Sequence, residues 1–244
     1  MSPTGPAGPA GPGAGAGGGL PASAAAGASG APRDELVTAA PRTSEVLHRG
    51  YVWDLVRDVV TLDGVEGGAL GSGTVTRELL RHPGAVGVLA LDDDERILLV
   101  RQYRHPVEHL LWELPAGLLD VAGEPPHLAA ARELAEEADL RAGTYHVLLD
   151  WFLSPGGSDE AFRLFLARDL SPVPEAERHR REAEEAGMVS TWVPLEAARD
   201  AVLAGDLNSP SLVAGVLAAW TARERGWSEL RPLDAPWPQH RAYR

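Results

Sequence analysis

Residues 117–140 read GLLDVAGEPPHLAAARELAEEADL, and the rest of the chain is organised around them. In a helix of 3.6 residues per turn, Glu133 and Glu137 lie on one face and Glu136 lies at its edge. Like charges at this spacing repel by about 0.2–0.5 kcal/mol unless a cation joins them. Arg132 offsets only part of the charge, because at i,i+4 it faces Glu136 rather than Glu133. Since hard divalent cations, above all Mg2+, prefer oxygen ligands, the spacing predicts a metal site.

The residues that precede this helix distinguish it from an ordinary solvated acidic face, which is the commoner explanation of an ExxEE pattern. ELPAG at residues 113–117 is typical of a strand end that turns sharply, and Gly117 can adopt conformations denied to other residues. GEPP at residues 123–126 then introduces the helix, because proline is tolerated in a first turn that needs no N–H donor. Loop, helix and acidic side chains therefore form one unit.

This unit resembles the Nudix box, the signature of the Nudix hydrolase superfamily, in which a glycine and a glutamate precede RE-aliphatic-x-EE-x-G-aliphatic. The residues that fit the box are Gly117, Glu124, Arg132, Glu133, Leu134, Glu136, Glu137 and Leu140. Two features depart from it. The interval from Gly117 to Glu124 is one residue longer than usual, which a loop tolerates. Asp139 stands where the box carries glycine, and Asp can also adopt the left-handed conformation.

The resemblance implies an α+β fold, the Nudix fold, with a mixed β-sheet sandwiched between α-helices and N-terminal antiparallel strands. It also implies metal-dependent hydrolysis of a pyrophosphate, with Mg2+ as the cofactor and Mn2+ as the alternative. The implied metal ligands are the carbonyl of Ala116 and the side chains of Glu133, Glu136 and Glu137. Catalytic roles fall to Glu133, Glu137 and a glutamate on a later loop. Arg132 is expected to buttress the helix and its carboxylates.

That later glutamate is expected in EAEEAGM at residues 182–188, a charged segment before an apolar strand. By composition alone the segment is a polar loop. Nudix enzymes that cleave ADP-ribose carry a general base or added metal ligand on the corresponding loop. The position of this general base before the strand matches Glu185 best and Glu184 second. A mobile loop would bring the base to bound substrate.

Substrate-binding candidates lie outside the box. RQYRH at residues 101–105 precedes it, and we expect Arg104 to hold a phosphate bidentately; the alternative is a solvated strand end. Glu113, Arg77 and Trp53 are further candidates. Trp53 and Tyr51 could stack on adenine, although aromatic residues at strand spacing more often pack in the core.

SPGGSDE at residues 154–160 is a turn by composition and resembles the S/A-P-G-x-S-[DE]-E segment of ADP-ribose pyrophosphatases. ELPAG favours the same subgroup, so we expect cleavage of ADP-ribose to AMP and ribose 5-phosphate. One alternative is a Nudix hydrolase of another nucleoside diphosphate derivative: a nucleotide sugar, NADH or an oxidised nucleotide. The other is a non-catalytic domain that senses ADP-ribose. Such domains tend to lose box carboxylates, which this chain retains.

Composition limits which binding partners and which cellular compartment are expected for this protein. The 22 basic and 35 acidic residues give a net charge of −13, which disfavours non-specific binding to nucleic acid or anionic membrane. Cysteine is absent, so the chain has no disulfide framework and no zinc–thiolate site. The N-terminus lacks the features of a signal peptide, and no apolar run is long enough to span a bilayer. We therefore expect a cytoplasmic protein that acts on a small molecule.

The pattern along the chain predicts three regions. Residues 1–41 are rich in Gly, Ala and Pro and are expected to be a disordered tail. Residues 42–232 are expected to form the hydrolase domain, and residues 233–244 a C-terminal extension. Predicted strands occupy residues 45–63, 74–81, 84–91, 96–103, 145–152, 161–167 and 189–193; predicted helices occupy 128–138, 194–204 and 210–225.

Two further expectations concern the loops and the assembly. DDDE at residues 92–95 is predicted to be a solvated turn between strands rather than a calcium loop. The family commonly forms homodimers in which N-terminal strands exchange and complete the neighbour's site. We expect the strands within residues 45–81 to serve this purpose in a homodimer.

Overall fold

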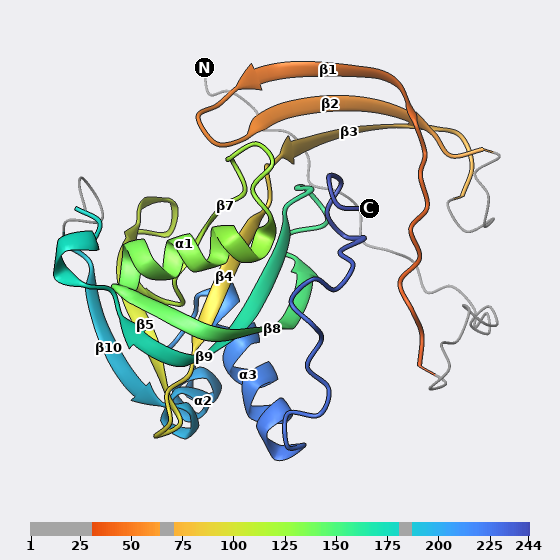
Figure 1. The fold of residues 1–244 in the computed structure, drawn as a ribbon. Coiled ribbons are helices and arrows are strands. Elements are labelled where there is room, and N and C mark those ends of the chain that lie inside the picture. The colour runs from red at the N-terminus through yellow and green to blue at the C-terminus, as the bar shows by residue number, and fades with distance from the viewer. Residues whose placement is uncertain (1–30, 64–70, 181–186) are drawn as a thin grey trace, which may run out of the picture. The chain divides into compact units, whose positions relative to one another are not determined.

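The computed structural model describes residues 31–63, 71–180 and 187–244. The chain divides into two units, Met1–Val37 and Thr38–Arg244. In the first unit, residues 31–37 are described and are exposed. The second unit contains the helices and strands labelled in Figure 1. The predicted disordered tail falls mostly outside the described residues, and the boundaries at 41/42 and 232/233 stay predictions.

The N-terminal strands form an antiparallel sheet of their own, as the sequence predicts. Its strands are β1 (Pro41–Arg49), β2 (Asp54–Thr61) and β3 (Thr74–Arg81), in the order β1-β2-β3. Arg57 of β2 pairs across the sheet with Glu78 of β3, at 2.6 Å between Nη2 and Oε1. Both side chains are exposed, so the pair contributes little stability.

The aromatic residues of this sheet are not in the core. Tyr51 and Trp53 lie in the turn between β1 and β2, and the Gly50 N–H donates to the carbonyl of Trp53. Tyr51 is fully exposed and Trp53 is 41% exposed. The core assignment favoured by strand spacing is therefore wrong, because these residues belong to the turn and not to either strand.

A mixed four-stranded sheet lies at the centre of the fold. Its strands are β4 (Ala85–Ala90), β7 (Ala116–Leu118), β8 (Leu140–Phe152) and β9 (Ala161–Pro172), in the order β7-β4-β9-β8. β4 runs parallel to β9, whereas β7 and β8 run antiparallel to their neighbours. A third sheet has the order β10-β5-β6, from β5 (Arg96–Arg104), β6 (His109–Glu113) and β10 (Val189–Pro194).

Helices cover both faces of the central sheet. They are α1 (Pro126–Ala138), α2 (Leu195–Ala204) and α3 (Pro210–Glu224). Along β4, Val86 and Val88 pack in the cluster that contains α1, whereas Ala85 and Leu89 pack in the cluster that contains α2 and α3. This alternation is the period-two pattern of a strand buried on both faces. It confirms the predicted α+β sandwich.

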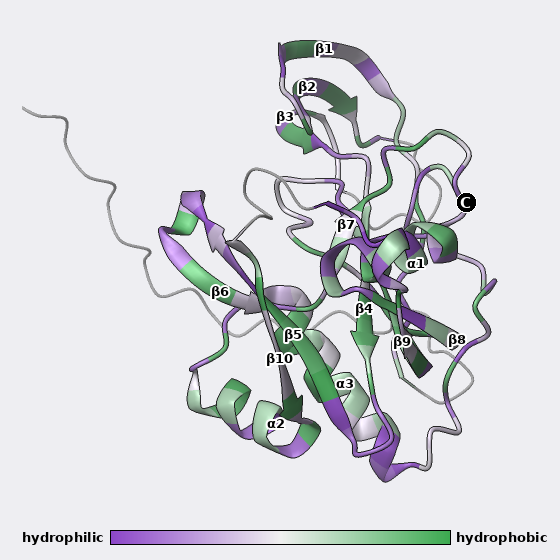
Figure 2. Cartoon of the chain, turned by 60° about the vertical axis from the view of Figure 1, so that its left-hand side comes forward, coloured by the Kyte–Doolittle hydropathy of each residue, from purple (hydrophilic) through white to green (hydrophobic). Residues whose placement is uncertain are grey.

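The distribution of hydropathy agrees with this arrangement. β4 and much of β5 are coloured as apolar, whereas α1 carries both apolar and polar segments (Figure 2). The buried residues of α1 are Ala129, Ala130, Leu134 and Glu137. Three of these four are apolar, so Glu137 is a carboxylate held at the edge of the core. Among the described residues, no helix is long and apolar enough to cross a membrane.

Several elements differ from their predicted bounds. The strand end predicted at residues 113–117 is the end of β6, whose start the sequence pattern did not define; the short 3-10 turn His105–Val107 joins this five-residue strand to β5. The sequence pattern missed β7, which has only three residues. β8 begins at Leu140 rather than at the predicted residue 145. The prediction left out LRAGT because this segment lacks the apolar alternation that marks the rest of the strand. In each case backbone pairing with a neighbour, and not local propensity, defines the strand.

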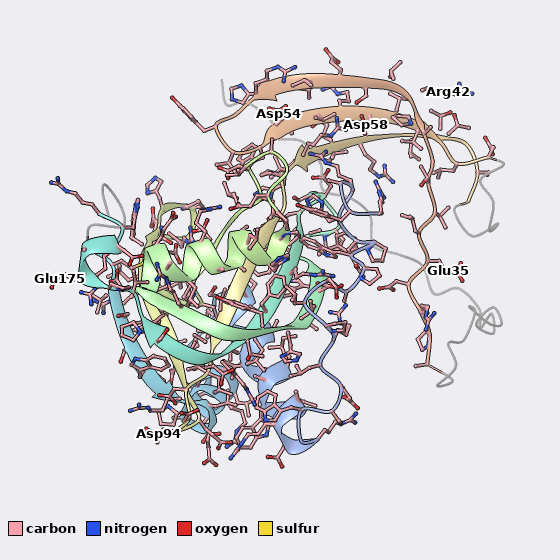
Figure 3. The ribbon with its side chains drawn as sticks, in the orientation of Figure 1. Glu35, Arg42, Asp54, Asp58, Asp94 and Glu175 are labelled. Atoms are coloured by element: carbon pink, nitrogen blue, oxygen red, sulfur yellow. The ribbon has the colours of Figure 1, made fainter. Side chains whose placement is uncertain are left out.

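The acidic segment between β4 and β5 is a turn, as predicted. The Asp92 carboxylate accepts hydrogen bonds from the backbone N–H groups of Asp94 and Arg96, at 3.1 and 2.8 Å. Its other oxygen pairs with the Arg96 side chain. Figure 3 shows Asp94 projecting from this turn. Asp92 thus serves the turn itself, by satisfying backbone donors that would otherwise need water.

Two histidines are expected to lower the free energy of unfolding in mild acid. Burial lowers the pKa of His82 and of His240 from the ordinary value near 6.5. The unfolded chain therefore binds more protons than the folded one just below pH 6.5, and the free energy of unfolding falls as pH drops through that window. Urea unfolding at about pH 7 and pH 5.5 measures this fall, which His82→Asn should reduce.

The control for this prediction is His48→Gln, which changes an exposed histidine of β1. This variant should show the same pH dependence as the unmodified protein. An equal fall in the His82→Asn protein would contradict the assignment to His82.

Candidate active site

The predicted carboxylates of α1 face β7. The backbone N–H of Ala116 donates to Glu137 Oε2 at 3.0 Å, and Glu137 is only 9% exposed. The Glu133 carboxylate lies against Gly117, where an added Cβ would be 2.0 Å from Glu133 Oε1. The helix therefore presents two of its carboxylates to one short strand.

Space, rather than backbone conformation, explains the glycine at position 117. Gly117 lies in β7 and is not among the glycines with positive φ. The expectation that it adopts a conformation denied to other residues is therefore wrong. Because Glu133 occupies the volume that a side chain would need, glycine is required for close approach.

Arg132 joins three of the box glutamates. Its Nε and Nη2 bind the two carboxylate oxygens of Glu124, at 3.2 and 3.0 Å. Its Nη1 binds Glu133 at 2.6 Å and Glu136 at 3.3 Å. The prediction that Arg132 faces Glu136 rather than Glu133 is therefore wrong, because the guanidinium fork reaches both. Arg132 connects the loop before α1 to the carboxylates on it.

This network has a clear electrostatic consequence. The hydrogen bond with Glu124, supported by the charge of Glu133, raises the pKa of Arg132 above its ordinary value despite partial burial. The guanidinium stays charged at every working pH and neutralises part of the acidic cluster. The buttressing role expected of Arg132 has this physical basis.

The end of α1 confirms the reading of Asp139. This residue is the C-cap of the helix, with φ 53° and ψ 34° in the left-handed region, and its N–H donates to the carbonyl of Leu134. Asp therefore performs the role that glycine has in the usual box.

A cavity of about 430 Å3 opens beside Arg132 and Glu136. Its remaining lining residues are Ala135, Glu177, Arg178, His179 and Arg180. In the sequence, Arg180 directly precedes the segment that is predicted to carry the catalytic base. Glu184 and Glu185 themselves lie outside the described residues.

Comparison with known proteins decides the family. Residues 81–213 match the NUDIX domain family, and this match covers more than half of the chain. The chain belongs to the NUDIX family. An ADP-ribose pyrophosphatase of Mycobacterium tuberculosis is 48% identical over 195 residues, which cover 80% of this chain and 89% of that protein.

Two further similarities agree with this assignment. An ADP-ribose pyrophosphatase of Bacillus subtilis is 42% identical over 109 residues, or 45% of this chain and 56% of that protein. A crystal structure of an ADP compounds hydrolase aligns with a TM-score of 0.62 over 80% of this chain and 99% of that one. At 19% identity this last likeness shows the Nudix fold alone.

The donor set of the Nudix box fits a hard divalent cation, on which members of the family depend. Glu133 and Glu137 offer oxygen atoms beside β7, and Arg132 already holds a positive charge among three carboxylates. In the described part of the chain, however, no three His, Asp or Glu side chains are grouped as a ready-made metal site. The metal-ligand assignments therefore stay predictions.

The predicted substrate residues Arg104 and Glu113 bind each other. Arg104 Nε and Nη2 donate to the two oxygens of Glu113, at 2.9 and 2.6 Å. Glu113 is 7% exposed at the end of β6, whereas Arg104 is exposed, so a buried carboxylate holds a guanidinium at the surface. A phosphate would have to share Arg104 with this carboxylate.

Arg77 lies in the β1–β3 sheet and Trp53 lies in a turn between two of its strands, whereas the Nudix box includes β7 and α1. Arg77 is exposed on β3 and donates to the carbonyl of Thr76 at 2.9 Å, and Trp53 lies in the β1–β2 turn. In the described part of the chain, the β1–β3 sheet and the sheet that contains β7 are separate. Their predicted role in substrate binding is therefore tied to the predicted homodimer.

Sequence reasoning missed the contribution of the C-terminal segment, residues 231–244. Trp237 is 2% exposed and packs in the same core cluster as α1. Tyr243 Oη donates to the backbone carbonyl of Glu124, a Nudix-box residue. The concentration of Trp, His and Tyr at the end of the chain was the available signal, because large aromatic residues seldom occur in a solvated tail.

Proposed function

We propose that this protein hydrolyses the pyrophosphate bond of ADP-ribose to AMP and ribose 5-phosphate with a divalent cation. The observation that carries the proposal is the placement of Glu133 and Glu137 against β7 with Arg132 joining the box glutamates. A sensor domain has no need of this intact arrangement. Relatives named ADP-ribose pyrophosphatase, one similar over most of its length, support the substrate.

The box residues are assigned to the cation, for which we propose Mg2+. Glu133, Glu137 and the carbonyl of Ala116 would hold it, and Glu136 would share it. When bound, Mg2+ neutralises the charge of the pyrophosphate and increases the acidity of water. The Ala116 N–H orients the Glu137 carboxylate, and Arg132 orients Glu133 and Glu136.

Glu185 is proposed as the general base, with Glu184 as the second choice. Water attacks in line at phosphorus, a P–O bond to the water oxygen forms, and the bridging P–O bond breaks. The proton of the water passes to the base, and the displaced phosphate leaves with the bridging oxygen. Arg104 would bind the phosphate that is not attacked, in competition with its bond to Glu113.

We also propose a homodimer in which the β1–β3 sheet of one subunit supplies Trp53 and Arg77 to the other subunit's site. The exposure of both residues and their separation from the box sheet in a single chain support this arrangement. The cytoplasmic location expected from the sequence stays a prediction.

The reaction can be tested with purified protein, ADP-ribose, Mg2+ and 18O-labelled water, with products followed by mass spectrometry. The expected products are AMP and ribose 5-phosphate in equal amounts, with one 18O atom in one of them. The labelled product identifies the attacked phosphorus.

The same samples without Mg2+, or with EDTA, are the control and should show no turnover. Tight binding of ADP-ribose without cleavage would instead identify a sensor. Turnover confined to nucleotide sugars, NADH or oxidised nucleotides would keep the chemistry and reject ADP-ribose as substrate.

A further inference from the structure

We propose that Tyr243 is a positioning residue for this hydrolysis: through its hydroxyl group the C-terminal segment holds the loop that carries Glu124, and with it the carboxylates of α1. The inference rests on the proposed function for its kinetic consequences. Its structural content is independent of the substrate. In Figure 1 the segment is the dark-blue chain that follows α3, and Arg231 bridges Val147 of β8.

The segment is anchored in the core before it reaches the box. Arg163 of β9 is 2% exposed and pairs with Asp150 at 2.7 Å. The same guanidinium donates to the carbonyls of Ala235 and Pro236, at 2.8 and 3.0 Å, and lies 4.8 Å from the ring centroid of Trp237. A buried cation with these partners fixes the path of the chain.

His240 then joins the segment to the start of the loop. Its Nε2 donates to the carbonyl of Pro83 at 2.6 Å. The ring lies so close to Gly84 that a Cβ there would be 2.4 Å from Nε2. The carbonyl of Gly84 in turn accepts a hydrogen bond from the N–H of Leu119, where the loop begins. The segment therefore packs on the residue that holds one end of the loop.

Tyr243 contacts the other end. Its ring stacks on Trp237, with centroids 5.6 Å apart and planes at 12°. Its Oη donates to the backbone carbonyl of Glu124 at 3.2 Å. Burial and the neighbouring Glu124 carboxylate raise the pKa of Tyr243, so the hydroxyl remains a donor at neutral pH.

The position of Glu124 determines the rest of the box. Glu124 binds two nitrogen atoms of Arg132, and Arg132 binds Glu133 and Glu136. The interval between Gly117 and Glu124 is one residue longer than in the usual box. A longer loop has more conformational freedom, so an external contact at its end has more to restrain. Loss of the Tyr243 hydroxyl should therefore loosen Glu124 and displace Arg132.

A purely structural role would give different results from a positioning role. Tyr243→Phe keeps the ring that stacks on Trp237 and removes only the hydroxyl. Tyr145→Phe is the matched control, because it removes the hydroxyl of another partly buried tyrosine, one that packs edge-on against Phe165. Tyr243→Ala removes both the hydroxyl and the stacked ring.

The experiment measures three quantities for each variant: kcat and KM for ADP-ribose, Mn2+ affinity by electron paramagnetic resonance, and hydrogen exchange of the amides in residues 119–124. For Tyr243→Phe we expect kcat and Mn2+ affinity each to fall by about two- to tenfold, as for loss of one hydrogen bond. KM should change by less than about twofold. The loop amides should exchange faster, with the melting temperature within about 2 °C of the unmodified protein.

Either of two results would overturn the proposal. The first is a Tyr243→Phe protein whose kinetics, Mn2+ affinity and loop exchange match those of Tyr145→Phe. The second is an effect seen only in Tyr243→Ala, which would assign the role to the stacked ring. Should the unmodified protein not cleave ADP-ribose, the proposed function fails, while Mn2+ affinity and loop exchange still decide the role of Tyr243.

Discussion

Glu137→Gln is expected to lower kcat for ADP-ribose by about 10^3-fold, because an anionic ligand that contributes several kcal/mol to transition-state stabilisation becomes neutral. Glutamine keeps an oxygen atom that can accept the hydrogen bond from the Ala116 N–H, now 3.0 Å long. The fold should therefore persist. Steady-state kinetics at saturating Mg2+, together with circular dichroism and the melting temperature, measure both parts of this prediction.

The control is Glu229→Gln, which makes the same chemical change on the surface. Glu229 pairs with Arg225 in an exposed i,i+4 contact, and such pairs contribute little. Its kcat should remain within about twofold of the unmodified protein. Near-normal turnover of Glu137→Gln would remove Glu137 from the proposed cation ligands.

Residues of one continuous stretch were the easiest to place from sequence. The spacing of Glu133, Glu136 and Glu137, the cap at Asp139 and the helix itself follow from local geometry and appear in the structure as expected. Residues 84–91 and 161–167 were likewise predicted as strands, and they form β4 and β9 of the buried central sheet. Local periodicity predicts these features because the spacing of residues along a helix or strand determines which face each side chain occupies.

Contacts between distant segments were not accessible in the same way. The reach of Arg132 to Glu124 depends on how the loop before α1 folds back, and the Arg104–Glu113 pair depends on the β5–β6 register. The bond from Tyr243 to Glu124 spans 119 positions. None of these leaves a periodic signal in the sequence.

Gly117 shows the limit of reasoning from residue type. A motif position occupied by glycine admits two physical explanations, a special φ or a need for space. The sequence suggested the first, whereas the structure shows an extended glycine packed against a carboxylate. Only the position of Glu133, which belongs to another element, distinguishes the two explanations.

Gly117→Ala is therefore expected to impair activity far more than stability. A Cβ at this position would be 2.0 Å from Glu133 Oε1 and 2.1 Å from its Cδ, so the carboxylate must move. Glu133 is a long side chain that can rotate away, and β7 tolerates alanine, so we expect a stability loss of about 1 kcal/mol or less. Displacement of a cation ligand should lower kcat by about 10^2-fold or more. Kinetics and urea unfolding on the same preparations separate the two effects.

Gly157→Ala is the matched control, because an added Cβ there meets nothing within 4 Å and the residue lies in a turn without positive φ. This variant should keep both activity and stability. Movement of Glu133 also breaks its 2.6 Å bond to Arg132, so Gly117→Ala should weaken Mn2+ binding. A Gly117→Ala enzyme with normal kcat and normal Mn2+ affinity would show that the Glu133 carboxylate works equally well away from β7, which contradicts its assignment as a cation ligand there.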